Sequence, residues 1–351
     1  DCHCRPSDRR DEDRSSRPPV KPPACSFCHS SMAHQEHRMS TSEPQTITFV
    51  LLAYNQEKYI AEAIKGALSQ TYTPLEIIFS DDCSNDQTFK IIEKIVKNYN
   101  GPHKICLNRN ITNIGLISHV NKVNDMCSPG LVIVAAGDDI STSDRTERIV
   151  QEWSENPKST SFHSSVIKID SEGHLGDAWK TPKANFASLK DYMEFSIIIG
   201  ATHAWHTDVH KFFGPITTHR AREDRIVAAR SAMKFGVTFI DEPLVHYRTN
   251  GMSNSNYGAS HNTDPLPEAE MRMSELSQAI IDSTKAFPNN SKNSDLIAIS
   301  AQKIFAQILS EINQRKSFRF YLDMILQAPI PYVRLLLKYL QTQYLSAKNR
   351  D

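Results

Sequence analysis

The sequence predicts an α/β fold in which a mainly parallel sheet is covered by helices on both faces. Three observations lead to this prediction. From residue 46 onward, short apolar runs alternate with segments whose apolar residues recur at helical spacing. The apolar runs are continuous and rich in β-branched residues, as expected for strands buried on both faces. Polar clusters directly follow three of these runs, where such folds bind ligands.

The first two strand–helix units precede residue 100. The strand Ile47 to Ala53 is followed by a helix whose apolar face includes Ile60 and Ile64. The strand Leu75 to Ser80 leads through a polar turn, residues 81–86, into a second amphipathic helix. This order of strand and helix builds parallel sheets.

Two further units follow. A strand near Lys104 to Leu107 precedes a turn at Gly115 and a helix. The strand Leu131 to Ala136 is the most apolar of the four, and a helix through Trp153 comes after it. Beyond residue 160 we expect a strand and turn in 161–174, a buried strand in 195–205, a helix in 223–236, and two short strands in 237–248.

Composition bounds the domain organisation and the class of partner. The 351 residues carry 40 Lys and Arg against 40 Asp and Glu, a balance that argues against a nucleic-acid-binding protein. Residues 1–45 are rich in charge, Ser and Pro, so we expect a disordered or non-native tail. We expect residues 46–262 to form the α/β domain, and residues 263–351 to form a helical C-terminal region.

No stretch approaches the roughly 18 apolar residues of a membrane span, and the chain does not open with a basic segment followed by an apolar one. We therefore expect a cytoplasmic protein. Residues 334–340 combine Arg and Lys with Leu. Such a helix could lie on the inner face of an anionic membrane, or pack on the α/β domain or a second copy of the chain. Packing is the reading we favour.

The seven cysteines show no regular spacing, and their number is odd, so we expect reduced thiols. Residues 25–29 fit the C-x-x-C-H pattern of haem attachment, and Cys2, Cys4, Cys25 and Cys28 could form a zinc site. Haem attachment requires export, and the first cysteine pair is irregular, so we expect neither. Met39 opens a natural start for the first strand, and we expect residues 1–38 to be upstream or non-native sequence.

Three polar clusters fall at the carboxyl ends of predicted strands: Tyr54-Asn55, Asp81-Asp82 and Asp138-Asp139. Neighbouring carboxylates suit a divalent cation such as Mg²⁺ or Mn²⁺, which commonly takes one or two carboxylates together with substrate phosphates. The glycine-rich phosphate-binding motifs are missing from the sequence. An isolated Asp pair could also simply end a strand and stabilise the next helix. The recurrence of polar clusters at one edge favours a site for a diphosphate substrate with its cation.

The sequence resembles glycosyltransferase family 2, an inverting group with the GT-A fold. The matching text is "ITFVLLAYNQEKYIAEAIKGALSQTYTPLEIIFSDDCSNDQT", followed by "NIG", "GDDIS", "RED" and "EPLVHYR". The resemblance implies a three-layer α/β/α sandwich with a mainly parallel sheet, followed by C-terminal helices. It also implies transfer of a sugar from a nucleotide-diphosphate donor to a hydroxyl of a glycan or lipid-linked acceptor, as in bacterial polysaccharide pathways.

The resemblance also implies roles for residues of the donor site. Tyr54 matches the aromatic residue that packs on the nucleotide base, with Asn55 beside it, and Asp82 matches the Asp that binds the base edge. Asp139 corresponds to the carboxylate that meets the cation, and Asp138 to the one facing the ribose or donor sugar.

A further set of residues is expected at the reaction centre. Asp224 matches the family's catalytic base, with Glu223 next to it, and Arg248 is placed to approach the donor phosphates. Trp205 and His206 follow an apolar strand where this fold meets the acceptor, so we expect acceptor contacts there, although a large aromatic beside an apolar strand more often packs in the core.

Two other functions stay open. The family's fuller metal motif carries one more Asp, where this chain has Ala136. A catalytically inactive nucleotide-sugar-binding protein would fit that change. A nucleotidyltransferase is the other alternative, but it should have a Gly-rich basic loop after the first strand, which "AYNQEKY" is not.

Overall fold

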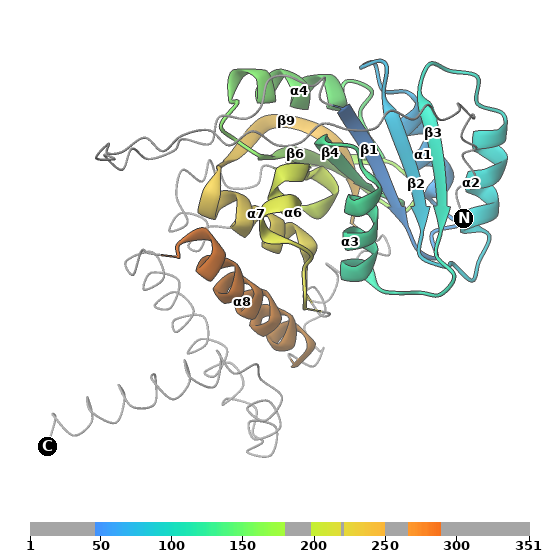
Figure 1. Ribbon diagram of the computed structural model, residues 1–351. Helices are drawn as coiled ribbons and strands as arrows, with labels where there is room; N and C mark the ends of the chain where they lie inside the picture. The colour runs from blue at the N-terminus through green and yellow to red at the C-terminus, as the bar shows by residue number, and fades with distance from the viewer. Residues whose placement is uncertain (1–45, 180–197, 219–220, 250–265, 289–351) are drawn as a thin grey trace, which may run out of the picture. The chain divides into compact units, whose positions relative to one another are not determined.

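The computed structural model describes residues 46–179, 198–218, 221–249 and 266–288 (Figure 1). The expectations for the N-terminal tail and its cysteine motif and for the helix around residues 334–340 lie outside this part of the chain. Cys83, Cys106 and Cys127 are free thiols, as expected.

The four predicted strands form one half of the sheet. They are β1 (Thr46–Ala53), β2 (Glu76–Asp81), β3 (Lys104–Arg109) and β4 (Gly130–Ala136). They run parallel in the spatial order β3-β2-β1-β4. The chain moves outward from β1 to β3 and then crosses back to β4, so the direction of winding reverses between β1 and β4. Open parallel sheets bind ligands at such a reversal, beyond the carboxyl ends of the strands.

Helices cover both faces of this half, as predicted (Figure 1). One face packs against α1 (Ile60–Leu68), α2 (Thr88–Lys97) and α4 (Arg145–Glu155). The other packs against α3 (Leu116–Met126), α6 (Thr207–Phe213) and α7 (Glu223–Lys234). Alternate residues of β1 serve the two layers, with Phe49 and Leu51 on the first and Val50 on the second. The result is the expected three-layer α/β/α arrangement.

The second half of the sheet departs from the prediction in two places. Of the strand expected in 195–205, the structure describes residues 198–205, which hold a short turn, η1 (Gly200–Thr202), and the start of the three-residue strand β8 (Ala204–His206). The two short strands expected in 237–248 are one strand, β9 (Val237–Arg248). Its pairing with β6 (Ser161–Ile169) shifts register near Pro243, where proline has no N–H for the ladder. The strand therefore bends but does not end.

Two strands and one helix complete the described structure. The hairpin strand β7 (Leu175–Trp179) pairs with β6, and β5 (Ile140–Ser141) pairs with the end of β9. The helix α8 (Leu266–Ala286) packs alongside α7 (Figure 1). Among the described helices, none combines the length and the apolar character that a membrane span requires.

Candidate active site

The loops after β1 and β2 are tied together by Asn55. This residue adopts a left-handed conformation with φ of 53°, which asparagine tolerates better than most residues. Its N–H donates to Ser84 Oγ at 2.8 Å, and its Oδ1 accepts from the Asn85 N–H at 2.8 Å. Asn55 therefore positions the loop, and the neighbouring Tyr54, 40% exposed, is the aromatic ring available at this edge.

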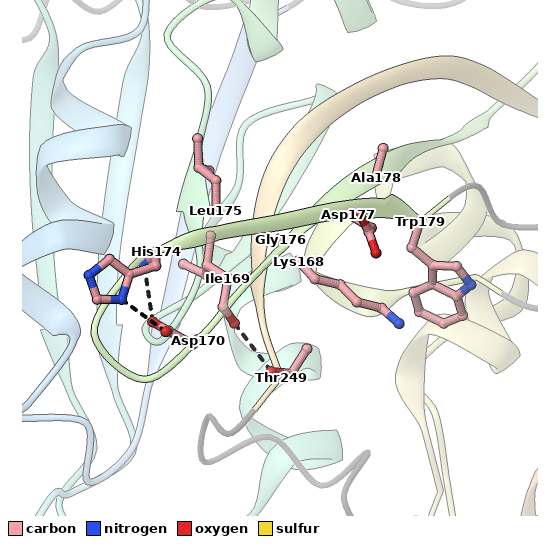
Figure 2. A pocket seen from close by; sticks show the side chains of 10 residues that line it. All are labelled: Lys168, Ile169, Asp170, His174, Leu175, Gly176, Asp177, Ala178, Trp179 and Thr249. Carbon is pink, nitrogen blue, oxygen red and sulfur yellow. Dashed lines mark hydrogen bonds and ion pairs between the residues drawn. The ribbon is translucent and has the colours of Figure 1, made fainter.

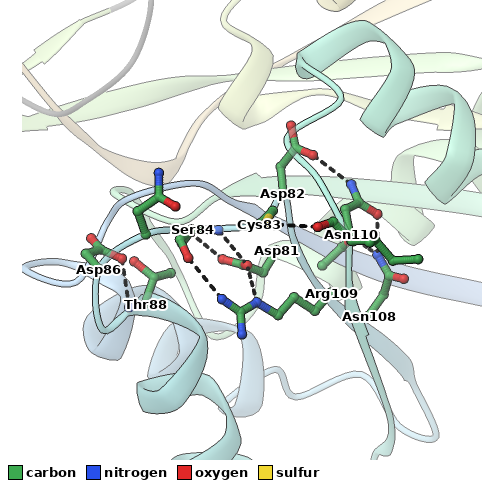
Figure 3. Close-up of polar contacts among 12 residues, drawn as sticks. Asp81, Asp82, Cys83, Ser84, Asp86, Thr88, Asn108, Arg109 and Asn110 are labelled. Atoms are coloured by element: carbon green, nitrogen blue, oxygen red, sulfur yellow. Dashed lines mark hydrogen bonds and ion pairs between the residues drawn. The ribbon is translucent and has the colours of Figure 1, made fainter.

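Asp82 is buried beneath the loop that follows β3 (Figure 3). Its Oδ1 accepts from Asn110 Nδ2 at 2.8 Å and from the Ile114 N–H at 3.0 Å, and its Oδ2 accepts from the Gly115 N–H at 2.9 Å. A carboxylate has about four lone-pair positions. These three bonds therefore fix Asp82 in place and leave it about one acceptor position, on Oδ2, for a ligand.

Asp81, the other member of this pair, serves the turn. Its Oδ1 accepts from the Ser84 N–H at 2.9 Å, and its Oδ2 accepts from the Ser84 hydroxyl. The Arg109 guanidinium approaches Oδ1 at 3.5 Å (Figure 3). Asp81 is fully buried. Both of its oxygens are thus bound to Ser84, and they hold the loop that follows Asp82 in place.

The acidic pair after β4 is held by the end of β9. Ile140 of β5 lies opposite His246 of β9, and the Arg248 N–H donates to Asp139 Oδ1 at 2.8 Å. Asp139 Oδ2 is buried and has no hydrogen-bond partner within the described residues. Burial, and secondly the charge of Asp138, raise the pKa of Asp139 well above its usual range. An ionised Asp139 is therefore costly unless a cation offsets its charge.

Arg248 lies elsewhere than expected. Its guanidinium is buried, with Nε donating to the Asp138 carbonyl at 2.9 Å and Nη1 to the Asp170 carbonyl at 2.7 Å. Nη2 donates to Glu62 at 2.8 Å, and the group stacks 4.3 Å from the centre of the Tyr59 ring. Arg248 therefore braces the acidic loop from within and does not present a free guanidinium to a phosphate.

Glu223 and Asp224 open α7 and face the turn η1. A methyl group built on Gly200 would lie 2.9 Å from Glu223 Oε1 and 3.3 Å from Asp224 Oδ2, so glycine lets both carboxylates approach the turn closely. Burial raises the pKa of Asp224 to about 6. Burial, and secondly Asp224, raise that of Glu223 to about 8. Burial therefore favours one shared proton on this pair near neutral pH, and Glu223, whose pKa is raised further, is the residue that holds it more readily.

The sheet brings these groups to one edge. Leu52 of β1 is level with Ala136, and Ala53 is level with Asp81. The residues that follow β2 and β4 thus lie two strands apart, roughly 10 Å. Ala136 also packs against a cluster that includes Ile199 and Ala201, which flank Gly200 in the turn that Asp224 faces. Both acidic pairs are therefore built around the end of β4, at the reversal of winding.

Comparison with known proteins agrees with this arrangement. Residues 48–212 match the family model described as Glycosyl transferase family 2. These residues belong to glycosyl transferase family 2. A Haemophilus influenzae protein named as an uncharacterized glycosyltransferase is 32% identical over 145 residues, covering 39% of this chain and 44% of that protein. The chain spans less than half the length of the curated relatives it matches first.

Solved structures identify the fold as GT-A. Staphylococcus aureus TarS residues 1–349, in complex with UDP-GlcNAc, superpose with a TM-score of 0.56 at 16% identity, covering 84% of this chain and 80% of that one. A mannosyltransferase from Pyrobaculum calidifontis, in complex with GDP-Man and Mn²⁺, gives 0.53 at 14% identity, covering 88% of each chain. The family 2 match ends before Asp224 and Arg248, so the placement of these two rests on the geometry above.

The surroundings of Asp139 fit a divalent cation. Its buried, unpartnered Oδ2 supplies an oxygen ligand of the kind that Mg²⁺ and Mn²⁺ prefer. No group of three or more His, Cys, Asp or Glu side chains close enough to hold a metal occurs in the described part of the chain. A cation here would take one or two carboxylates from the protein, and its remaining ligands from a diphosphate and water.

Two residues that the sequence predicted at the acceptor site, Trp205 and His206, lie elsewhere in the structure. Trp205 is only 2% exposed, in the core between the sheet and α3, and its Nε1 donates to Asn124 Oδ1 at 2.9 Å. His206 is also buried and lies opposite Leu131, at the start of β4. Because His206 pairs with Leu131, it lies about 16 Å along β4 from Ala136, the last residue of the strand before the acidic pair. Neither residue can meet an acceptor at the acidic edge.

Trp179 is an aromatic residue near this site that the sequence did not predict there. It packs on the cluster that includes Ala136 and Ile199. It also lines a groove of about 400 Å³ under the β6–β7 hairpin, with Lys168 Nζ 4.9 Å from its ring centre and Asp177 beside it (Figure 2). The sequence gives no clear signal for this placement, because Leu175, Asp177 and Trp179 share one face of a strand but differ in polarity.

Proposed function

We propose that the protein is an inverting glycosyltransferase that moves a sugar from a nucleotide-diphosphate donor to a hydroxyl of a glycan or lipid-linked saccharide. One observation carries the proposal: a buried acidic pair with an unpartnered oxygen and a second, partly ionised pair flank the end of the same strand. The first suits a diphosphate with its cation, and the second suits the removal of a proton.

The donor is expected to lie along the edge formed by β2, β1 and β4. Tyr54 offers an exposed ring for the base, and Asp82 retains about one acceptor position for the base edge. Asp138 is expected near the ribose or donor sugar, with Asp139 near the pyrophosphate. A divalent cation bound there would neutralise the charge that builds on the departing diphosphate.

The acceptor is expected to approach from the side of α7. Asp224 accepts the proton of the attacking hydroxyl as its oxygen bonds to the anomeric carbon and the bond from that carbon to the diphosphate breaks. The pKa of Asp224, raised by burial to about 6, leaves it ionised at neutral pH yet more basic than an exposed Asp. The Trp179 groove, which adjoins this centre, supplies an aromatic face of the kind that sugar rings stack on.

The direct test is a panel of nucleotide sugars incubated with the purified chain and Mn²⁺ or Mg²⁺. Release of a nucleoside diphosphate from one donor, read by mass spectrometry and lost on chelation, supports the proposal. A β-configured product from an α-linked donor would establish inversion. No release from any donor, with nucleotide binding retained, would overturn it.

A binding protein without catalysis is the second candidate, and Ala136 is the observation that favours it. Ala136 stands where the family's fuller metal motif has a carboxylate, and its side chain packs against the cluster that includes Ile199 and Ala201. Such a protein would bind nucleotide sugars at the same edge without releasing the diphosphate. The donor panel separates the two candidates.

A further inference from the structure

The segment that carries the proposed base is tied to a helix outside the family 2 match. Glu275 of α8 accepts three hydrogen bonds from Arg222, the residue that precedes α7. The Arg222 N–H and Nε reach Oε1 at 3.1 and 2.7 Å, and Nη2 reaches Oε2 at 3.1 Å. Arg225 Nη1 approaches the same Oε2 at 3.7 Å. One carboxylate thus binds both arginines that flank Glu223 and Asp224.

This arrangement decides where two positive charges lie. Arg222 and Arg225 are each within two residues of Asp224, and either could form an ion pair with it if released. A guanidinium paired with Asp224 would oppose protonation of that carboxylate. Glu275 is largely buried, with 11% of its side chain exposed, so solvent screens its pairs with the two arginines only weakly.

We propose that Glu275 is a positioning residue, which holds the Arg222 and Arg225 guanidiniums away from Asp224 and so keeps this carboxylate able to accept a proton. The inference rests on the function proposed above, in which Asp224 is the base. The charged groups of its own segment are Arg222, Glu223 and Arg225. From α8 the facing charge is Glu275, with Arg272 one turn earlier, and from η1 the neighbour is the uncharged Gly200.

Charge effects around the base are consistent with this role. Burial is the main cause of the raised pKa of Asp224. Glu275 also raises it, whereas Arg225 and Arg222 lower it. Removing the Glu275 charge therefore removes an interaction that raises the pKa of Asp224. Arg225 and Arg222, which already lower this pKa, are then no longer offset by the Glu275 charge.

The test compares Glu275→Gln with Asp282→Asn. Asp282 pairs with Arg230 further along the same two helices, at 2.7 Å from Nε, and both side chains are almost fully buried. Both variants remove one negative charge from the α7–α8 contact, but only Glu275 touches the arginines beside the base. The readouts are thermal unfolding and the pH profile of kcat/KM for donor turnover.

In Glu275→Gln, the acidic limb of the profile should move down by about 1 pH unit, the low end of the effect of an opposite charge within roughly 4–6 Å. Donor KM should stay unchanged, kcat at pH 7 should fall, and Glu275→Asp should restore part of both. Asp282→Asn should leave the acidic limb in place. An unmoved limb in Glu275→Gln, or an equal shift in Asp282→Asn, would overturn the inference.

A second measurement does not need activity. Asp224→Asn should raise the unfolding temperature at pH 8, because it removes a buried charge, and the gain should be smaller in a Glu275→Gln background. Equal gains in both backgrounds would show that Glu275 does not act on Asp224. If the wild-type chain turns over no donor, the proposed function fails, while this cycle still decides the coupling between Glu275 and Asp224.

Discussion

The backbone N–H of Arg248 donates a 2.8 Å hydrogen bond to Asp139 Oδ1. The bond joins the last residue of β9 to the loop after β4, two segments more than 100 positions apart in the sequence. It fixes one oxygen of Asp139 and leaves the other, Oδ2, buried without a partner in the described structure. Backbone geometry thus sets the direction of the oxygen that the proposed cation would meet.

Asp139→Asn tests this ligand. Asparagine keeps an acceptor for the Arg248 N–H but loses the charge, so cation-dependent binding of UDP or GDP should weaken by at least about tenfold, the low end of the cost of disturbing even a ligand's supporting contacts. Isothermal titration with Mn²⁺ measures it. The matched control is Asp144→Asn, an exposed carboxylate five residues away. Equal binding by Asp139→Asn and wild type would remove Asp139 from the cation site.

Asp224→Asn should lower transfer by roughly 10² to 10⁴, the usual contribution of a general base, while donor binding persists. Glu223→Gln should cost much less, because the pKa of Glu223, raised by burial to about 8, keeps this side chain protonated at neutral pH. Donor turnover and nucleotide affinity are measured for both variants at pH 7. If Glu223→Gln proves the more damaging change, the two roles are reversed.

The free energy of unfolding should decrease as the pH rises, because the pKa of Glu223 is raised in the folded chain. Between about pH 4.5 and 8 the folded chain holds the Glu223 proton more tightly than the unfolded chain does, since its folded pKa is raised. The folded state therefore loses stability as the pH rises through this range. Glu223→Gln removes the effect, so its unfolding temperature should exceed that of wild type by more at pH 8 than at pH 5. The exposed Glu155→Gln should show no such trend, and a constant difference in Glu223→Gln would contradict the assignment.

Asp282→Ala should destabilise the chain by about 3–5 kcal/mol, because it leaves the buried Arg230 without its ion-pair partner. Glu242→Ala breaks the ion pair between Arg148 and Glu242, which is partly exposed, and should cost less than about 1 kcal/mol. Denaturant unfolding of both variants gives the comparison. A loss below about 1 kcal/mol in Asp282→Ala would mean that its ion pair with Arg230 contributes little to stability.

Trp205→Phe should reduce stability by about 1–3 kcal/mol, since it strips Asn124 of the Nε1–H donor in the core. It should leave the KM for the acceptor unchanged. Trp179→Ala should do the opposite, weakening use of a saccharide acceptor with a smaller loss of stability. The two variants are compared by unfolding and by acceptor titration once the donor panel has identified a turnover assay. An acceptor effect confined to Trp205 would restore the prediction made from sequence.

Much of the fold could be predicted because its first half is local in character. The strands β1, β2 and β4 are built on continuous apolar runs, β3 on the shorter run Ile105 to Leu107, and an amphipathic helix follows each of the four. That order already requires a parallel sheet, whose carboxyl ends share one edge. Tyr54, Asp82 and Asp139 were therefore expected at one edge from their positions alone, and the register of β1 with β2 and β4 confirms it.

The sequence by itself determined the layers of this protein and the strand ends at which its carboxylates lie, since apolar periodicity and chain order govern both. Only the tertiary structure decided which way the later residues point. Because β8 pairs antiparallel with β4, Trp205 lies in the core, and His206 lies at the end of the sheet where β4 begins. Arg248 and Glu275 acquired their partners through contacts across more than 50 positions, and nothing in the local pattern of either segment encodes such distant pairing.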